Sequence, residues 1–172
     1  MKIEIDTRKQ KLVLMDERGI ALKTYSVSTA KNGVGEKNGS FCTPGGGHIV
    51  RAKIGAGQPL NTVFVRRRPT GELWTAELDA RHPGRDWILT RILWLSGCEP
   101  GRNRLGDVDT MRRYIYIHGS PDTAAMGKPG SIGCVRMRNR DVVELFDLVP
   151  PYTPVEIRGS RAAAGSTGRR AP

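Results

Sequence analysis

A histidine and a cysteine stand at the two ends of one loop in this chain. The segment Y-I-Y-I-H ends at His118, and a loop rich in glycine and proline then leads to Cys134 within the sequence G-S-I-G-C-V-R-M. A thiol and an imidazole placed in this way can meet in space, which is the minimum that nucleophilic catalysis by a thiolate requires. We therefore interpret Cys134 as the candidate nucleophile and His118 as the candidate general base.

Each of these residues also has a purely structural interpretation. Cysteine is among the most often buried residue types, and a buried histidine is commonly satisfied by a backbone carbonyl. Two glycines, Gly130 and Gly133, precede Cys134, and such a turn can expose backbone N–H groups to a substrate. This context favours the catalytic interpretation of Cys134.

Two other histidines compete with His118 for the role of base. His82 stands in the turn sequence R-H-P-G, and His48 follows three glycines at the start of a predicted strand. Neither has a cysteine in a comparable setting, although Cys42 is close to His48 in the sequence. We interpret Cys42 and Cys98 as structural.

Short strands and turns dominate the elements that must position the candidate site. The chain has 21 glycines and 11 prolines among 172 residues, which favours turns over long helices. Alternating or continuous apolar runs predict strands at 3–6, 12–15, 20–27, 48–50, 63–67, 87–95, 113–117 and 153–158. The first three follow one another through turns of hairpin length and therefore predict a β-meander.

One amphipathic helix is predicted over 139–149. Its apolar residues, at Val142, Leu145, Phe146 and Val149, recur at helical spacing, and two prolines follow. Asn139 is the predicted N-cap, because an asparagine side chain can accept from the backbone N–H groups of a first helical turn.

The length of the chain favours one domain, over residues 1–158. Residues 159–172 are small, polar and basic, and they cannot bury enough apolar area to offset the entropy of ordering. We therefore predict a disordered basic tail over 159–172.

The formal net charge of +11 favours an anionic partner. Nucleic acid is the usual partner of so basic a chain, but no run of five basic residues and no known nucleic-acid-binding motif is present. We expect no nucleic-acid partner and keep a non-enzymatic anion-binding β domain as an alternative.

The sequence also bears on compartment and on metals. The first residues show no secretory signal and no segment is apolar enough to span a bilayer, so we expect a cytoplasmic protein, with the periplasm or cell envelope as the alternative. The three cysteines lie far apart with no C-x-x-C pair, which suits a reducing compartment. We predict no metal and no cofactor.

The phrase H-G-S, followed by S-I-G-C-V-R-M, resembles the signature of the L,D-transpeptidase catalytic domain, the YkuD-like family. The resemblance extends over about 2–158, through the opening strands, the segment G-S-F-C-T-P-G-G-G-H and the last strand P-V-E-I. It implies a mainly β fold, a sandwich of two mixed sheets with one or two short helices. One departure is Ile132, where the family usually has histidine; the base, His118, is retained.

The resemblance implies acyl transfer on the stem peptide of peptidoglycan, at the bond between diaminopimelate and D-Ala. Cys134 would attack the carbonyl and His118 would take up the thiol proton, or the two would rest as a thiolate–imidazolium pair. The Gly119 carbonyl, or that of Ser120, would orient the imidazole. The N–H groups of Gly133 and Cys134 would stabilise the oxyanion.

Three further side chains are expected to bind the peptide, namely Arg136, Ser131 and Ser120. An arginine offers a planar fork for a substrate carboxylate. The favoured acyl acceptor is water, which gives an L,D-carboxypeptidase of peptidoglycan recycling. The alternative is an amine, which gives an L,D-transpeptidase that cross-links the wall.

Overall fold

Alternating apolar side chains at the start of the chain form an antiparallel meander. Ile3 and Ile5 of the first strand and Leu12 and Leu14 of the second are all buried, and the residues between them are more exposed. This alternation places one face of the meander on the core. The predicted β-meander is confirmed.

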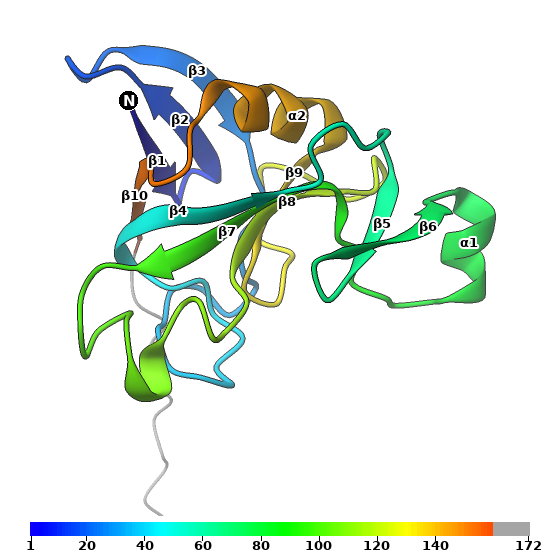
Figure 1. Cartoon of the computed structure of the whole chain (residues 1–172). Helices are drawn as coiled ribbons and strands as arrows, with labels where there is room; N and C mark the ends of the chain where they lie inside the picture. The colour runs from blue at the N-terminus through cyan, green and yellow to red at the C-terminus, as the bar shows by residue number, and fades with distance from the viewer. Residues whose placement is uncertain (160–172) are drawn as a thin grey trace, which may run out of the picture.

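The computed structural model describes residues 1–159, and Figure 1 shows the arrangement of its elements. The strands are β1 (Lys2–Asp6), β2 (Lys11–Met15), β3 (Ala21–Ser26), β4 (Gly46–Ile54), β5 (Thr62–Val65), β6 (Arg68–Leu73), β7 (Leu89–Gly97), β8 (Tyr116–Ser120), β9 (Val135–Arg138) and β10 (Pro154–Arg158). The helices are α1 (Ala76–Arg81) and α2 (Asn139–Leu148), with a short 3-10 turn at Gly106–Val108.

All ten strands of this range belong to one hydrogen-bonded sheet. The order is β3-β2-β1-β10-β4-β7-β5-β6, and β8 branches from β7 and carries β9. The pairs β1–β10 and β8–β9 are parallel and the others are antiparallel. The mainly β class with mixed pairing is thus confirmed, and the two expected sheets are continuous with one another. Figure 1 shows β6 and α1 projecting on the side opposite to β1, β2 and β3.

Helix α2 covers the core as predicted. Val142, Leu145 and Phe146 are buried on one face, together with Val149 just after the last turn. They pack with the apolar residues of β1, β2, β7, β8, β9 and β10 in the main core. This packing fixes the strand pair β8–β9 against the helix.

The predicted N-cap of this helix is wrong. Arg138 is the N-cap residue and Asn139 is the first helical residue. The Asn139 side chain is used elsewhere: its Oδ1 accepts from the Thr90 hydroxyl at 2.6 Å, and its Nδ2 donates to Asn61 Oδ1 at 2.8 Å. Tertiary contacts therefore took the side chain that the local pattern assigned to capping.

Strand β8 lies three residues further along than predicted. The prediction ended the strand at 117, but β8 runs from Tyr116 to Ser120 and pairs with both β7 and β9. Tyr114 has φ of 56°, a left-handed conformation that interrupts an extended segment. Strands β6 and β9 and helix α1 were not predicted.

The predicted tail, 159–172, lies outside the described residues except for Gly159. Within residues 1–159 no helix has the length and apolar character needed to cross a membrane.

Candidate active site

The register of two parallel strands places the predicted nucleophile and base on one face. In the β8–β9 pair, Ile117 lies opposite Val135 and His118 lies opposite Arg136. Side chains alternate along a strand, so His118 and Arg136 share a face, and Cys134, two residues before Arg136, extends from the same side. Ile117 and Val135 face the main core.

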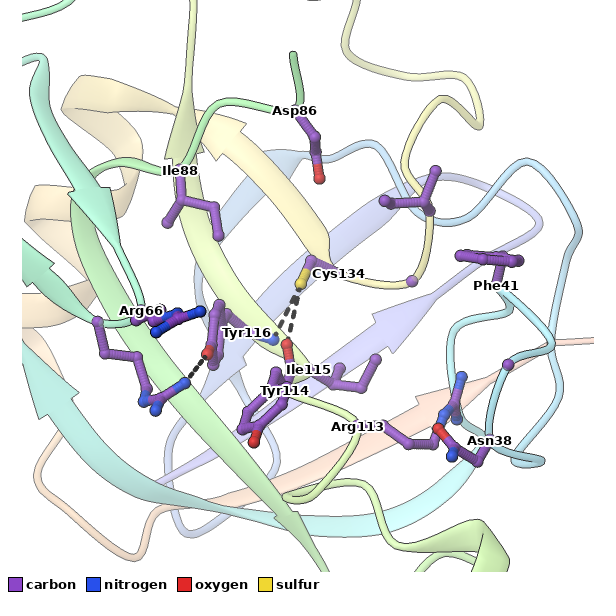
Figure 2. A pocket seen from close by; sticks show the side chains of 14 residues that line it. Asn38, Phe41, Arg66, Asp86, Ile88, Arg113, Tyr114, Ile115, Tyr116 and Cys134 are labelled. Carbon is purple, nitrogen blue, oxygen red and sulfur yellow. Dashed lines mark hydrogen bonds between the residues drawn. The ribbon is translucent and has the colours of Figure 1, made fainter.

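The Cys134 sulfur is held by the backbone of the strand beside it. The Tyr116 N–H donates to Sγ at 3.3 Å, and Sγ–H donates to the Tyr114 carbonyl at 3.4 Å (Figure 2). The side chain also packs against Ile92. Burial raises the pKa of the Cys134 thiol to about 12, although the Tyr116 N–H acts in the opposite direction. Burial therefore favours the neutral thiol in the ligand-free protein.

His118 is completely buried, and its ring is fixed by the next residue. Nδ1 lies 2.7 Å from the Gly119 carbonyl. A carbonyl only accepts, so Nδ1 carries the hydrogen and Nε2 is left with its lone pair. Nε2 has no hydrogen-bond partner within residues 1–159. Burial is the main cause that lowers the pKa of His118, so the ring is neutral.

One expectation about His118 is corrected, because it lies inside β8 rather than at the end of a strand. Burial favours the neutral form of both groups over a thiolate–imidazolium pair. Cys134 and His118 are not hydrogen-bonded to one another, since Nε2 has no partner.

Close packing requires glycine at position 119. A Cβ on Gly119 would lie 2.6 Å from the Leu89 carbonyl oxygen and would also overlap the Asn139 side chain. The expected contact between the Gly119 carbonyl and the His118 ring is present.

Ser131 and Gly133 shape the turn before Cys134. The Ser131 hydroxyl donates to the Cys134 carbonyl at 2.5 Å and accepts from the Gly133 N–H at 3.2 Å. Ser131 is buried and so is not exposed to a substrate. The Gly133 N–H is already bonded, so it is not a free donor for an oxyanion.

Ser120 and Arg136 also have partners within the protein. The Ser120 hydroxyl donates to the Met137 carbonyl at 3.0 Å and links β8 to β9. Arg136 Nη2 donates to Asp86 Oδ1 at 2.5 Å in an ion pair. One nitrogen of the arginine fork predicted to bind a carboxylate is therefore paired with a carboxylate of the chain itself. Asp86 was not among the predicted site residues.

The thiol opens into a cavity of about 810 Å³ (Figure 2). Three guanidinium groups and one carboxylate line it, which gives it a cationic character. Its lining residues are Asn38, Gly39, Phe41, Arg66, Arg67, Asp86, Ile88, Arg113, Tyr114, Ile115, Tyr116, Ile132, Gly133 and Cys134. Ile132, the departure from the family signature, is 54% exposed and lies in this cavity.

The tip of the β5–β6 hairpin brings two of these arginines to the cavity. Arg66 and Arg67 have φ of 48° and 66°, the left-handed pair typical of a two-residue hairpin turn. The Arg67 guanidinium lies 4.6 Å from the Trp94 ring centre and 4.8 Å from that of Tyr114. It also donates to the Tyr116 hydroxyl at 3.0 Å. The run R-R-R at 66–68 was the sequence signal for this feature.

Arg113 fixes the loop that forms the other side of the cavity. It donates to the carbonyls of Gly35, Glu36 and Cys42, at 3.2, 3.0 and 2.7 Å. Figure 2 shows Arg113 beside Asn38 on this side of the cavity. No local pattern indicates this role, because the contacts join residues more than 70 positions apart.

The competing histidines have structural surroundings. His48 is buried, with Nδ1 2.9 Å from the Gly46 carbonyl and Nε2 3.1 Å from the Thr110 hydroxyl. Desolvation lowers the pKa of His48 to about 4. His82 is exposed beside Trp87, with the two rings edge to face. Neither lines the cavity that contains Cys134.

Comparison with known proteins identifies the family. The sequence profile of the L,D-transpeptidase catalytic domain matches residues 1–157. A Bacillus subtilis (strain 168) protein named as the L,D-transpeptidase YkuD is 35% identical over 94 residues, which cover 55% of this chain and 47% of the relative. An Escherichia coli (strain K12) protein named as the L,D-transpeptidase YbiS is 32% identical over 117 residues, which cover 63% of this chain and 37% of the relative. The matched region thus spans less than half of these relatives.

Solved structures agree with this at the level of the fold. L,D-transpeptidase 3 from Mycobacterium tuberculosis superposes with a TM-score of 0.55 at 13% identity, covering 91% of this chain and 60% of that one. An Enterococcus faecium L,D-transpeptidase variant gives 0.54 at 15% identity, covering 91% and 49%. The profile match over nearly all of the described residues shows that this chain belongs to the L,D-transpeptidase catalytic-domain family.

Proposed function

We propose that this protein is a cysteine acyltransferase that acts on peptidoglycan stem peptides at the bond between diaminopimelate and D-Ala. One observation carries the proposal. A thiol opens into a cationic cavity, and the strand beside it carries, on the same face, a neutral imidazole whose Nε2 lone pair is unused. Membership of the family supplies the substrate class.

The proposed reaction begins with transfer of the thiol proton. The Cys134 S–H, which donates to the Tyr114 carbonyl in the ligand-free protein, turns to His118 Nε2. As the proton moves, Sγ bonds to the substrate carbonyl carbon and the C=O electron pair becomes an oxyanion. The Gly119 carbonyl, already bonded to Nδ1–H, stabilises the imidazolium that forms.

The second half of the reaction releases D-Ala. The oxyanion collapses, the C–N bond breaks, and the His118 Nε2–H is donated to the departing amine, which leaves a thioester on Cys134. The Tyr116 N–H, which points at the sulfur, is a proposed oxyanion donor in place of the Gly133 N–H. Removal of one such donor typically costs about 10²–10³ in rate.

The charge of the cavity supports a substrate with carboxylates. Arg66 and Arg67 lie on the hairpin tip, Arg113 lies on the facing side, and a stem peptide carries several carboxylate groups. We propose that these groups bind peptide carboxylates in addition to Arg136, to which the sequence analysis gave this role.

The acyl acceptor decides between two activities. We keep water as the proposed acceptor, which makes the enzyme an L,D-carboxypeptidase, and treat an amine as the alternative that would make it an L,D-transpeptidase. A cytoplasmic location is proposed with it, and the cell envelope is the alternative. Fractionation of cells with marker proteins for each compartment tests the location.

Incubation with a stem tetrapeptide, with and without an amine acceptor, tests the activity. Mass spectrometry should show loss of D-Ala, and Cys134→Ala should abolish it. Cys98→Ala is the matched control, because Cys98 is exposed and does not line the cavity. A tripeptide product supports hydrolysis and an amine adduct supports transpeptidation. Failure of the wild-type protein to release D-Ala from any stem peptide would contradict the proposed function.

A further inference from the structure

A second cavity adjoins the one that contains the nucleophile. It has a volume of about 230 Å³, and Asp86 lines both cavities. Its walls include Arg136, Arg85 and Trp87. The Arg85 guanidinium lies 4.1 Å from the Trp87 ring centre, and Trp87 Nε1 donates to Asp79 at 2.6 Å, so this wall is fixed by its own contacts.

A partly accessible ion pair stands where the two cavities meet. Asp86 Oδ1 accepts from Arg136 Nη2, and the two side chains are 26% and 19% exposed. Asp86 makes no other hydrogen bond within residues 1–159, so Oδ2 remains available to a ligand. In Figure 2 the Asp86 carboxylate points into the cavity that holds Cys134.

We propose that Asp86 and Arg136 form a subsite for a zwitterionic amino-acid head group. Asp86 binds the ammonium and Arg136 binds the carboxylate, and without ligand the two side chains neutralise one another. The inference rests on the proposed function and deepens it. The side chain of diaminopimelate ends in such a head group, a few bonds from the peptide bond that Cys134 would attack.

The charges at this site explain why a zwitterion is preferred over a simple ion. A dicarboxylate would place a negative group beside Asp86, and a diamine would place a positive group beside Arg136. A ligand with only one of the two charges also leaves one half-buried ionic group without a partner, which is the basis of strong discrimination. The Asp86–Arg136 pair is therefore a specificity determinant of this chain.

Binding to the catalytically silent Cys134→Ala protein separates this inference from the activity. Isothermal titration calorimetry would compare meso-diaminopimelate with pimelate, which lacks the amines, and with 1,5-diaminopentane, which lacks the carboxylates. Diaminopimelate should bind at least about tenfold more tightly than either. Asp86→Asn and Arg136→Gln, each added to Cys134→Ala, should weaken diaminopimelate binding by about 10- to 100-fold.

Matched controls distinguish the subsite from a general charge effect. Glu77 on α1 and Arg140 on α2 are exposed, and Glu77→Gln and Arg140→Gln should leave diaminopimelate binding unchanged. The double variant Asp86→Asn/Arg136→Gln removes both charges together and shows by its melting temperature whether the region still folds. If any variant fails to fold, the comparison of the three ligands on Cys134→Ala alone still tests whether the site prefers a zwitterion.

Two results would overturn the subsite. In the first, diaminopimelate binds no more tightly than pimelate or diaminopentane. In the second, the folded Asp86 and Arg136 variants bind it as Cys134→Ala does. Release of D-Ala by the wild-type protein is measured separately. Release of D-Ala without selective diaminopimelate binding therefore contradicts only the subsite. Selective diaminopimelate binding without release of D-Ala contradicts only the proposed function.

Discussion

Cys134, one residue before β9, and His118 in β8 lie on the same face of this parallel strand pair, yet each is held by backbone groups rather than by the other. The sulfur is bonded to the Tyr116 N–H and the Tyr114 carbonyl, and the His118 ring is bonded to the Gly119 carbonyl. Burial keeps both groups neutral. Activation is therefore expected when a substrate carbonyl arrives, and not in the empty protein.

Alkylation of Cys134 by iodoacetamide should be slow at neutral pH and should keep rising with pH. A thiol with a pKa raised to about 12 gains roughly tenfold more thiolate for each pH unit well below that value, so no plateau is expected between pH 6 and pH 10. Peptide mass mapping follows Cys134 separately from Cys98 and Cys42.

The variant His118→Asn tests whether His118 activates the Cys134 thiol in the ligand-free protein. Because the resting imidazole is neutral, alkylation of Cys134 at pH 7 should change by less than about threefold, whereas peptide turnover should fall by about 10²–10⁴. A rate plateau near neutral pH that disappears in His118→Asn would mean that a thiolate–imidazolium pair exists after all.

Gly119→Ala should destabilise the protein and abolish turnover. The added Cβ would lie 2.6 Å from the Leu89 carbonyl oxygen and overlap Asn139, and overpacking of this kind costs about 1–3 kcal/mol. It would also displace the carbonyl that orients His118. Thermal unfolding and peptide turnover are the measurements.

Gly47→Ala is the control for the glycine substitution. A Cβ on Gly47 would meet its nearest neighbour at 3.6 Å, an ordinary contact. This variant should unfold within about 1 kcal/mol of wild type. Equal losses of stability in the Gly47 and Gly119 variants would show that the close approach at Gly119 does not cause the destabilisation.

Ile132→His, which restores the usual residue of the family, should change little. Ile132 is 54% exposed in the cavity, so the free energy of unfolding should stay within about 0.5 kcal/mol. Since His118 is the proposed base, kcat/KM should remain within about tenfold of wild type. Ile20→His, 57% exposed and outside the cavity, is the control. An increase above a hundredfold in kcat would assign proton transfer to position 132.

Acid should destabilise the fold through its buried histidines. The pKa of His48 is lowered from its usual 6.5 to about 4, so between these values the unfolded chain binds more protons than the folded one. The contribution of His48 to the free energy of unfolding is complete above pH 6.5 and is lost as the pH falls through 4. This contribution is on the order of 3 kcal/mol. His118, whose pKa is also lowered, acts in the same direction.

Unfolding by urea at several pH values measures this effect. His48→Gln should flatten the pH dependence between pH 6.5 and pH 4, with a remaining slope from His118. His82→Gln, at an exposed position, is the matched control variant. An unchanged slope in His48→Gln would locate the acid sensitivity elsewhere.

Local patterns predicted most of the fold because they depend on near neighbours. The alternation of Ile3 and Ile5 fixed a strand with one buried face, and the spacing of Val142 and Leu145 fixed the buried face of α2. Asn139 shows where prediction from local patterns fails. Its type and position suit an N-cap, but Thr90 and Asn61, far away in the sequence, bond its side chain instead.

The sequence by itself determined the mainly β class and the family, and it predicted the thiol–imidazole pair, because each depends on short motifs and on periodic burial. Only the tertiary structure decided what the side chains around that pair do. Ser131 stabilises the turn before Cys134, and Arg136 forms an ion pair with Asp86. Burial favours the neutral forms of Cys134 and His118. These outcomes depend on desolvation and on contacts between residues distant in the chain, and no local pattern encodes either.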